Sequence, residues 1–126
     1  MNKTILIIGN PTNELDSYPT RILNDLTKSF PHWIFVHWDP SEELPPDTDS
    51  SVICIDTVIG IKQPQKFTTI EEFSLSPRNT VHDFDLCIAL KLLVKIKKLR
   101  SVIIIGVPIK ENNNTYSQLC TILRSI

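Results

Sequence analysis

Short, uninterrupted apolar runs are the feature that most constrains how this chain can fold. The runs are Ile5 to Ile8, Trp33 to Val36, Val52 to Ile55 and Val102 to Ile105. Strands that are buried on both faces of a parallel sheet have continuous apolar sequences, whereas strands with one solvated face alternate. Stretches with helical periodicity or polar loops separate these runs. The sequence therefore predicts the α/β class, a three-layer α/β/α sandwich with a mainly parallel twisted sheet.

Three segments have the spacing of helices. We expect one from about Ser17 to Phe30, a long one from Thr80 to about Leu99, and a last one from Tyr116 to Ile126. A short edge strand is expected from Lys66 to Ile70. In the long helix, the residues predicted to form the buried stripe are Phe84, Ile88, Leu92, Ile96 and Leu99, widened by Ala89 and Leu93.

Alternation and strand ends give two further expectations. In the segment Trp33 to Trp38, alternate residues should lie on opposite faces of the sheet, which separates the two tryptophans. The third strand, Ser51 to Asp56, is expected to end on its carboxylate.

Length and charge restrict the functional classes. The chain has 126 residues and a net charge of −1, which predicts a single domain over residues 1–126 and gives no electrostatic reason to expect nucleic acid or an anionic membrane as partner. No apolar run approaches the roughly 20 residues that span a bilayer, and no signal-peptide core is apparent. We therefore expect a cytoplasmic protein. Its three cysteines, Cys54, Cys87 and Cys120, lack the spacing of a zinc or redox motif and are expected to be buried.

Three polar side chains lie at equivalent places along the predicted fold. Asp16 follows the first strand, Asp56 ends the third, and His82 opens the long helix. Parallel strands bring such positions together at one edge of the sheet, where ligands bind in α/β folds. Two carboxylates and an imidazole suit a divalent ion such as nickel, zinc or iron, with coordination positions left open for water or substrate.

Each of these residues also has an ordinary structural interpretation. Asp16 can cap the first helix, and Asp56 can accept loop amide hydrogens. His82 can be a surface residue, although the positive end of the helix dipole favours its neutral form, the form that binds metal. A nucleophile elbow, a phosphate-binding glycine loop and a dinucleotide fingerprint are all absent from the sequence.

Three segments of the chain resemble the hydrogenase maturation proteases. They are ILIIGN with its following loop acid and Arg21, the strand ending in IDTV, and the helix start HDFDL. These endopeptidases trim the C-terminus of the nickel-iron hydrogenase large subunit. The resemblance implies that Asp16, Asp56 and His82 are both the metal ligands and the catalytic residues. It also implies that the partner is a large-subunit precursor and that the metal is nickel already held by this substrate, with zinc or another divalent ion as the alternative.

The first loop departs from the family pattern. Leu15 occupies the place of a first acid, and Ser17 and Pro19 stand where the family has glycines. The alternative interpretation is therefore a non-catalytic or differently specific module that binds a metal or a partner and keeps the same fold.

Overall fold

A five-stranded sheet forms the centre of the molecule in the computed structural model, which describes residues 3–8, 19, 22–45, 48–58, 60–74 and 81–126. The strand order is β2-β1-β3-β5-β4. The strands are β1 (Thr4–Ile7), β2 (Ile34–His37), β3 (Ser51–Val58), β4 (Gln65–Phe67) and β5 (Ser101–Pro108). The first three and β5 pair in parallel, and only β4, at one edge, pairs antiparallel with β5. The predicted, mainly parallel sheet is therefore confirmed.

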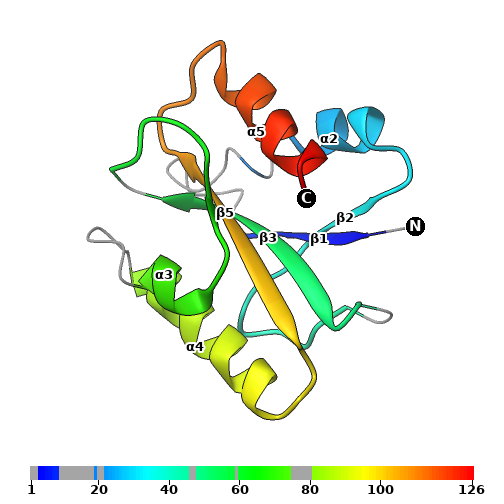
Figure 1. Cartoon of the computed structure of the whole chain (residues 1–126), viewed down its shortest axis with the longest axis vertical. Coiled ribbons are helices and arrows are strands. Elements are labelled where there is room, and N and C mark those ends of the chain that lie inside the picture. Colours follow the sequence, from blue (N-terminus) through cyan, green and yellow to red (C-terminus); the bar gives the residue numbers. More distant parts are fainter. Residues whose placement is uncertain (1–2, 9–18, 20–21, 46–47, 59, 75–80) are drawn as a thin grey trace.

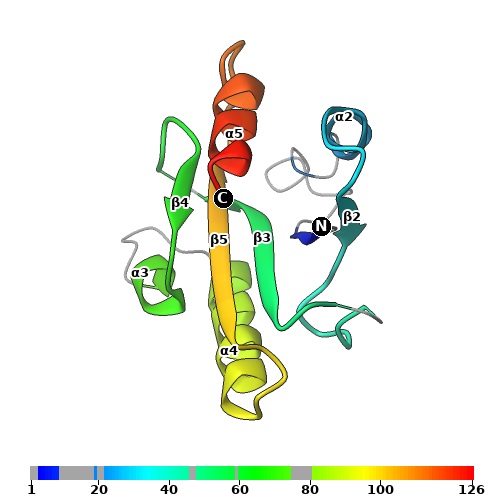
Figure 2. The same ribbon diagram turned by 45° about the vertical axis from the view of Figure 1, so that its right-hand side comes forward.

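Helices cover both faces of this sheet. They are α2 (Leu23–Ser29), α3 (Ile70–Ser74), α4 (Val81–Lys95) and α5 (Thr115–Arg124). Figure 1 shows α2 and α5 on one face and α3 and α4 on the other. In Figure 2, β4 and α3 lie to one side of β5, and β2 and α2 lie to the other. The arrangement is the predicted α/β/α sandwich.

Each face of the sheet carries its own hydrophobic cluster. On the face covered by α3 and α4, which we call the α4 side, Leu6 and Cys54 are completely buried. On the face covered by α2 and α5, the α5 side, Ile7 and Ile55 are completely buried. Successive strand residues point to opposite faces, so a strand covered on both sides must be apolar at every position. This is the physical reason for the apolar runs of β1, β3 and β5. The expectation that the run in β2 is also buried on both faces is wrong, because β2 lies at the sheet edge and Ile34 is 53% exposed.

The two tryptophans lie on opposite faces, as the alternation predicts. Trp33 packs on the α5 side, where its ring stacks on Phe30 with centroids 4.7 Å apart and Lys3 Nζ lies 5.4 Å from its ring centroid. Trp38 is buried on the α4 side, and its indole N–H donates to the backbone carbonyls of Glu42 and Glu43 at 3.2 and 3.1 Å. These bonds attach the loop after β2 to the core.

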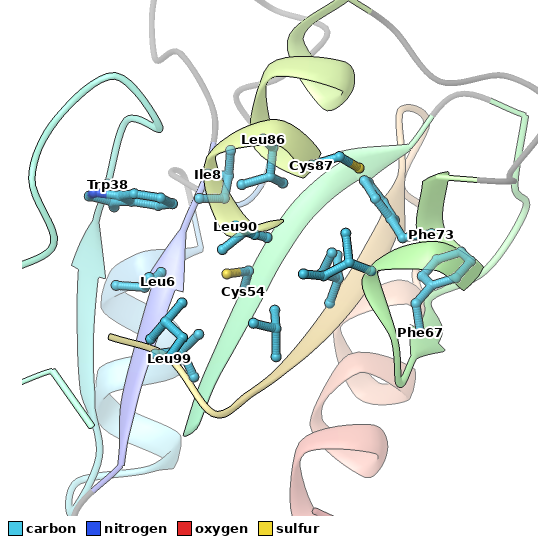
Figure 3. Close-up of a cluster of buried hydrophobic side chains, with 14 of the residues drawn as sticks. Leu6, Ile8, Trp38, Cys54, Phe67, Phe73, Leu86, Cys87, Leu90 and Leu99 are labelled. Carbon is cyan, nitrogen blue, oxygen red and sulfur yellow. The ribbon is translucent and has the colours of Figure 1, made fainter. Parts of the chain in front are cut away.

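The predicted buried stripe of the long helix is largely wrong. Ile88, Leu92 and Ile96 are 51, 56 and 52% exposed. The side chains that α4 buries are instead Leu86, Cys87 and Leu90 (Figure 3), while Ala89 and Leu93 are partly buried and Leu99 is buried as expected. The side chain of Phe84 lies outside the described residues. The prediction failed because this helix has apolar residues on two opposite faces, and periodicity alone does not identify the face that meets the sheet.

Other element boundaries also differ from the expectations. The predicted edge strand is shorter and continues into α3, a helix that was not predicted. Two local hydrogen bonds stabilise the start of α3. Thr69 Oγ1 accepts the Glu72 N–H at 3.0 Å, and the Glu72 carboxylate accepts the Thr68 N–H at 3.1 Å. This arrangement resembles a capping box. The first helix is described from Leu23, and its predicted start at Ser17 lies outside the described residues, as does Thr80 before α4.

Candidate functional site

The carboxyl edge of the sheet contains a topological switch point between β1 and β3. From β1 the chain continues to β2 on one side, whereas β3 and then β5 lie on the other. The Ile8 N–H donates to the Ile55 carbonyl at 2.9 Å, at the end of the pairing between β1 and β3. The next residue of β3 is Asp56. A crevice outside the strand ends at such a point is where α/β sheets bind ligands.

Asp56 is completely buried. Alternation along β3 places its side chain on the α4 side, with Cys54 before it and Val58 after it. Its Oδ1 accepts the backbone N–H of Thr57 at 2.9 Å, which fixes the orientation of the carboxylate. A buried carboxylate is costly unless hydrogen bonds or a cation compensate for its charge, which makes Asp56 a candidate functional residue.

The expectation that β3 ends on Asp56 is wrong, because β3 continues for two residues to Val58. The partner strand β5 extends equally far and places Gly106 opposite Asp56 and Pro108 opposite Val58. Asp56 therefore lies within the paired part of β3 and not in a mobile loop. Strand pairing gives the carboxylate a fixed position at the switch point.

Gly106 is required by close packing next to this position. A Cβ atom built on Gly106 would lie 2.7 Å from Val58 Cγ2 and 3.2 Å from Phe67 Cε2. Both of these side chains belong to the cluster on the α4 side. They therefore fill the volume that any larger residue at position 106 would need.

The cysteines do not provide a nucleophile. Burial, and secondarily the negative charge of Asp56, raise the pKa of the Cys54 thiol far above its usual range. Cys87 and Cys120 are buried as well, as the sequence predicts. A thiol attacks as the thiolate, which the surroundings of Cys54 strongly disfavour.

His82 is the second residue of α4. It precedes Leu86 by four residues, about 6 Å along the helix axis, and Leu86 belongs to the same cluster as Ile8, the residue after β1 (Figure 3). The backbone of His82 therefore lies toward the same edge of the sheet as Asp56. Its side chain and the whole of Asp16 lie outside the described residues, so the convergence of all three side chains stays a prediction.

Among the described residues, no group of three or more His, Cys, Asp and Glu side chains is arranged to hold a metal ion. That search includes Asp56 but not the side chains of its two predicted co-ligands. His32, which precedes β2, and His37, the last residue of β2, are both exposed.

Thr57 is a residue of this edge that the sequence analysis missed. It is buried and faces the α5 side, and its hydroxyl has no hydrogen-bond partner within the part of the chain that the structure describes. Threonine is common in strands, so its type carried no signal. Its position directly after Asp56 in the motif IDTV was the only available indication.

A cavity of about 460 Å³ opens where β3 and β5 end. Its lining residues come from the two loops that follow these strands and are Gly60, Ile61, Lys62, Ile109, Lys110 and Asn112. The cavity thus begins a few residues beyond Asp56 along β3. It provides space at the carboxyl edge of the sheet, on the β5 side of β3, whereas the switch point lies on the β1 side.

No protein-family model and no curated protein sequence matches this chain. Solved structures do. The NiFe hydrogenase maturation protease HybD from Thermococcus kodakarensis superposes with a TM-score of 0.62 at 16% identity, over 98% of this chain and 95% of that one. The hydrogenase maturating endopeptidase HybD from E. coli gives a TM-score of 0.64 at 14% identity, over 98% and 88%.

This chain has the fold of the hydrogenase maturation proteases. The solution structure of an endopeptidase from Escherichia coli, with a TM-score of 0.61 at 14% identity, supports the same conclusion. The predicted resemblance to this family is therefore confirmed at the level of the fold. None of the described helices is both long and apolar enough to cross a membrane.

Proposed function

We propose that this protein is an endopeptidase of the hydrogenase-maturation type, which removes a C-terminal peptide from the large-subunit precursor of a nickel-iron hydrogenase. The observation that carries the proposal is Asp56, a buried carboxylate fixed at the switch point of a chain with the maturation-protease fold. In this proposal the protein acts in the cytoplasm on a protein substrate.

The chemistry of the donor set supports recognition of a divalent ion. Asp56 supplies a carboxylate that the backbone of Thr57 orients, and burial lowers the dielectric around it. Asp16 would add a second carboxylate, and His82 would add an imidazole that the helix N-terminus keeps neutral. Carboxylate oxygen and neutral imidazole nitrogen are suitable ligands for nickel and for zinc.

The ion is best regarded as part of the substrate. Nickel that the precursor already holds would present open coordination positions, which Asp16, Asp56 and His82 would occupy. These residues would then bind and orient only a loaded precursor. The cavity between the loops after β3 and β5 offers space for the peptide next to the cleavage site, and Lys62 and Lys110 give its rim a positive charge.

The decisive experiment is a cleavage assay with the nickel-loaded precursor from the same source, read by the intact mass of the large subunit. We expect the wild-type protein to remove the C-terminal peptide and Asp56→Asn to lose this activity. Asn keeps the volume of Asp and an oxygen for the Thr57 N–H, but it removes the charge. The matched control is Asp85→Asn on α4. Asp85 is exposed, so this variant should cleave the precursor at the wild-type rate.

Calorimetry with nickel and zinc separates this proposal from its alternative. Under the proposal, Asp16→Ala, Asp56→Asn and His82→Ala each abolish the heat of metal binding, and the precursor is trimmed only by the wild type. Metal binding without trimming of any cognate precursor would favour a differently specific module, to which the departures at Leu15, Ser17 and Pro19 also point. A protein that neither binds metal nor trims the precursor would contradict both the proposal and its alternative.

A further inference from the structure

The outer face of α4 carries an apolar stripe that no described segment of the chain covers completely. The stripe consists of Ile88 and Leu92 on α4 and Ile96 directly after its end, each about half exposed at 51, 56 and 52%. Their spacing of four residues places them in one row along the helix. Contiguous exposed apolar surface of this kind is a common mark of an interaction site, whereas single exposed aliphatic residues are not.

The opposite face of α4 is already occupied. Leu86, Cys87 and Leu90 are buried against the sheet on the α4 side. A helix that packs on one side normally has a polar outer face. Because α4 is apolar on both faces, its composition resembles that of a helix that is covered from two sides.

A groove runs beside the stripe. It holds a cavity of about 250 Å³, and Trp38 and Leu44 provide apolar surface in it. One wall comes from α4 and the segment after it, and the other comes from the loop after β2. The residues that line the groove are Trp38, Pro40, Glu42, Glu43, Leu44, Ala89, Leu92, Leu93 and Lys98.

The two walls carry opposite charges. Glu42 and Glu43 lie on the loop wall and are exposed. Lys98 lies on the helix wall, and the exposed Lys91 and Lys95 extend the positive charge along α4. The surface therefore has an apolar centre between one acidic border and one basic border.

We propose that this surface, formed by the stripe, the groove and its two charged borders, is the contact between two copies of this chain in a symmetric dimer. A two-fold interface is made by the same patch on both subunits and must complement itself. An axis along the groove places α4 of each copy over the loop of the other. The lysines of one copy then face Glu42 and Glu43 of its partner, and the stripes cover both grooves.

Charge complementarity favours a second copy over other occupants. An acidic peptide would suit Lys91, Lys95 and Lys98, but Glu42 and Glu43 on the opposite wall would repel it. The same glutamates would oppose an anionic membrane surface. A partner with both signs of charge in the mirrored order fits both walls, and a second copy has that order by symmetry.

Analytical ultracentrifugation over a range of protein concentrations tests the dimer. We expect the wild type to sediment with twice the 14.4 kDa mass of one chain, and Leu92→Glu to raise the dissociation constant at least about 100-fold, because it buries an uncompensated charge. Ile34→Glu is the matched control, since Ile34 is equally exposed at 53% but belongs to β2. Circular dichroism checks that each variant is folded.

Charge exchange provides the specific test. A variant with Lys91, Lys95 and Lys98 changed to Glu and a second variant with Glu42 and Glu43 changed to Lys should each be monomeric. Mixed together, they should form heterodimers, because both borders of the first variant are then negative and both borders of the second are positive, so that each border faces its opposite charge. A monomeric wild type, a dimer that Leu92→Glu leaves intact, or a dimer that Ile34→Glu weakens equally would overturn the proposal.

Discussion

Gly106 permits a sharp prediction about packing beside the candidate site. An alanine at this position would place its Cβ 2.7 Å from Val58 Cγ2 and 3.2 Å from Phe67 Cε2. Carbon atoms in ordinary contact are about 3.5–4.0 Å apart, so the neighbouring side chains must retreat by close to 1 Å. Both neighbours are buried, and β5 is held by strands on both sides, so there is little space for that movement.

The magnitude follows from two opposing terms. Overpacking of a buried site costs about 1–3 kcal/mol. Replacing glycine by alanine reduces the freedom of the unfolded chain and returns about 0.4–1 kcal/mol. The middle of the two ranges gives a net decrease of about 1.3 kcal/mol in the free energy of unfolding of Gly106→Ala. For a chain of this length the melting temperature should fall by roughly 3–10 °C.

Urea denaturation of a double-mutant cycle with Val58→Ala tests the cause of this loss. Removal of the Val58 methyl groups opens the space that the new Cβ needs, so Gly106→Ala should cost less in that background, by about 1 kcal/mol or more. Strict additivity of the two changes, or a Gly106→Ala protein as stable as the wild type, would refute the packing argument.

Three further predictions concern buried polar groups. Trp38→Phe removes the indole N–H that bonds to the carbonyls of Glu42 and Glu43, and it should lower the free energy of unfolding by about 1–3 kcal/mol in urea denaturation. Because the pKa of Cys54 is raised in the folded protein, only the unfolded state loses this proton near pH 8.5. The free energy of unfolding, measured from pH 7 to 10, should therefore fall above about pH 8.5. The fall should be less steep in Cys54→Ala, which lacks the thiol. Asp56→Asn keeps an acceptor for the Thr57 N–H, so its free energy of unfolding should lie within about 1 kcal/mol of the wild-type value. A much lower free energy of unfolding would show that the carboxylate has a structural role.

The sheet was predictable because its physics is local to each strand. Ile5 to Ile8 and Val102 to Ile105 are apolar at every position, and only burial on both faces explains such a run in a chain of this size. The face of α4 was not predictable, because Leu86 and Leu90 on one side and Ile88 and Leu92 on the other satisfy the same period. The length of β3 was also not predictable, since it depends on how far the partner strand β5 extends.

The same distinction applies to the candidate site. The position of Asp56 at the carboxyl edge follows from the order of strands and loops in the sequence, and the structure places it there. Its complete burial depends on how the elements of the α4 side pack over β3, which the residues of β3 alone do not reveal. Thr57 had no distinguishing residue type, and only its burial shows that its hydroxyl lies in the core at this edge.

The separation of the two tryptophans makes the protein's own fluorescence a reporter of each face of the sheet. Trp33 stacks on Phe30 at the partly exposed margin of the α5 side, so its emission should be shifted to longer wavelength than that of the buried Trp38. The loop that Trp38 anchors carries Glu42 and Glu43, so events on the α4 side should change the emission at shorter wavelength. In a Trp38→Phe protein the remaining signal should follow the α5 side alone, which allows the two halves of the core to be observed separately during unfolding.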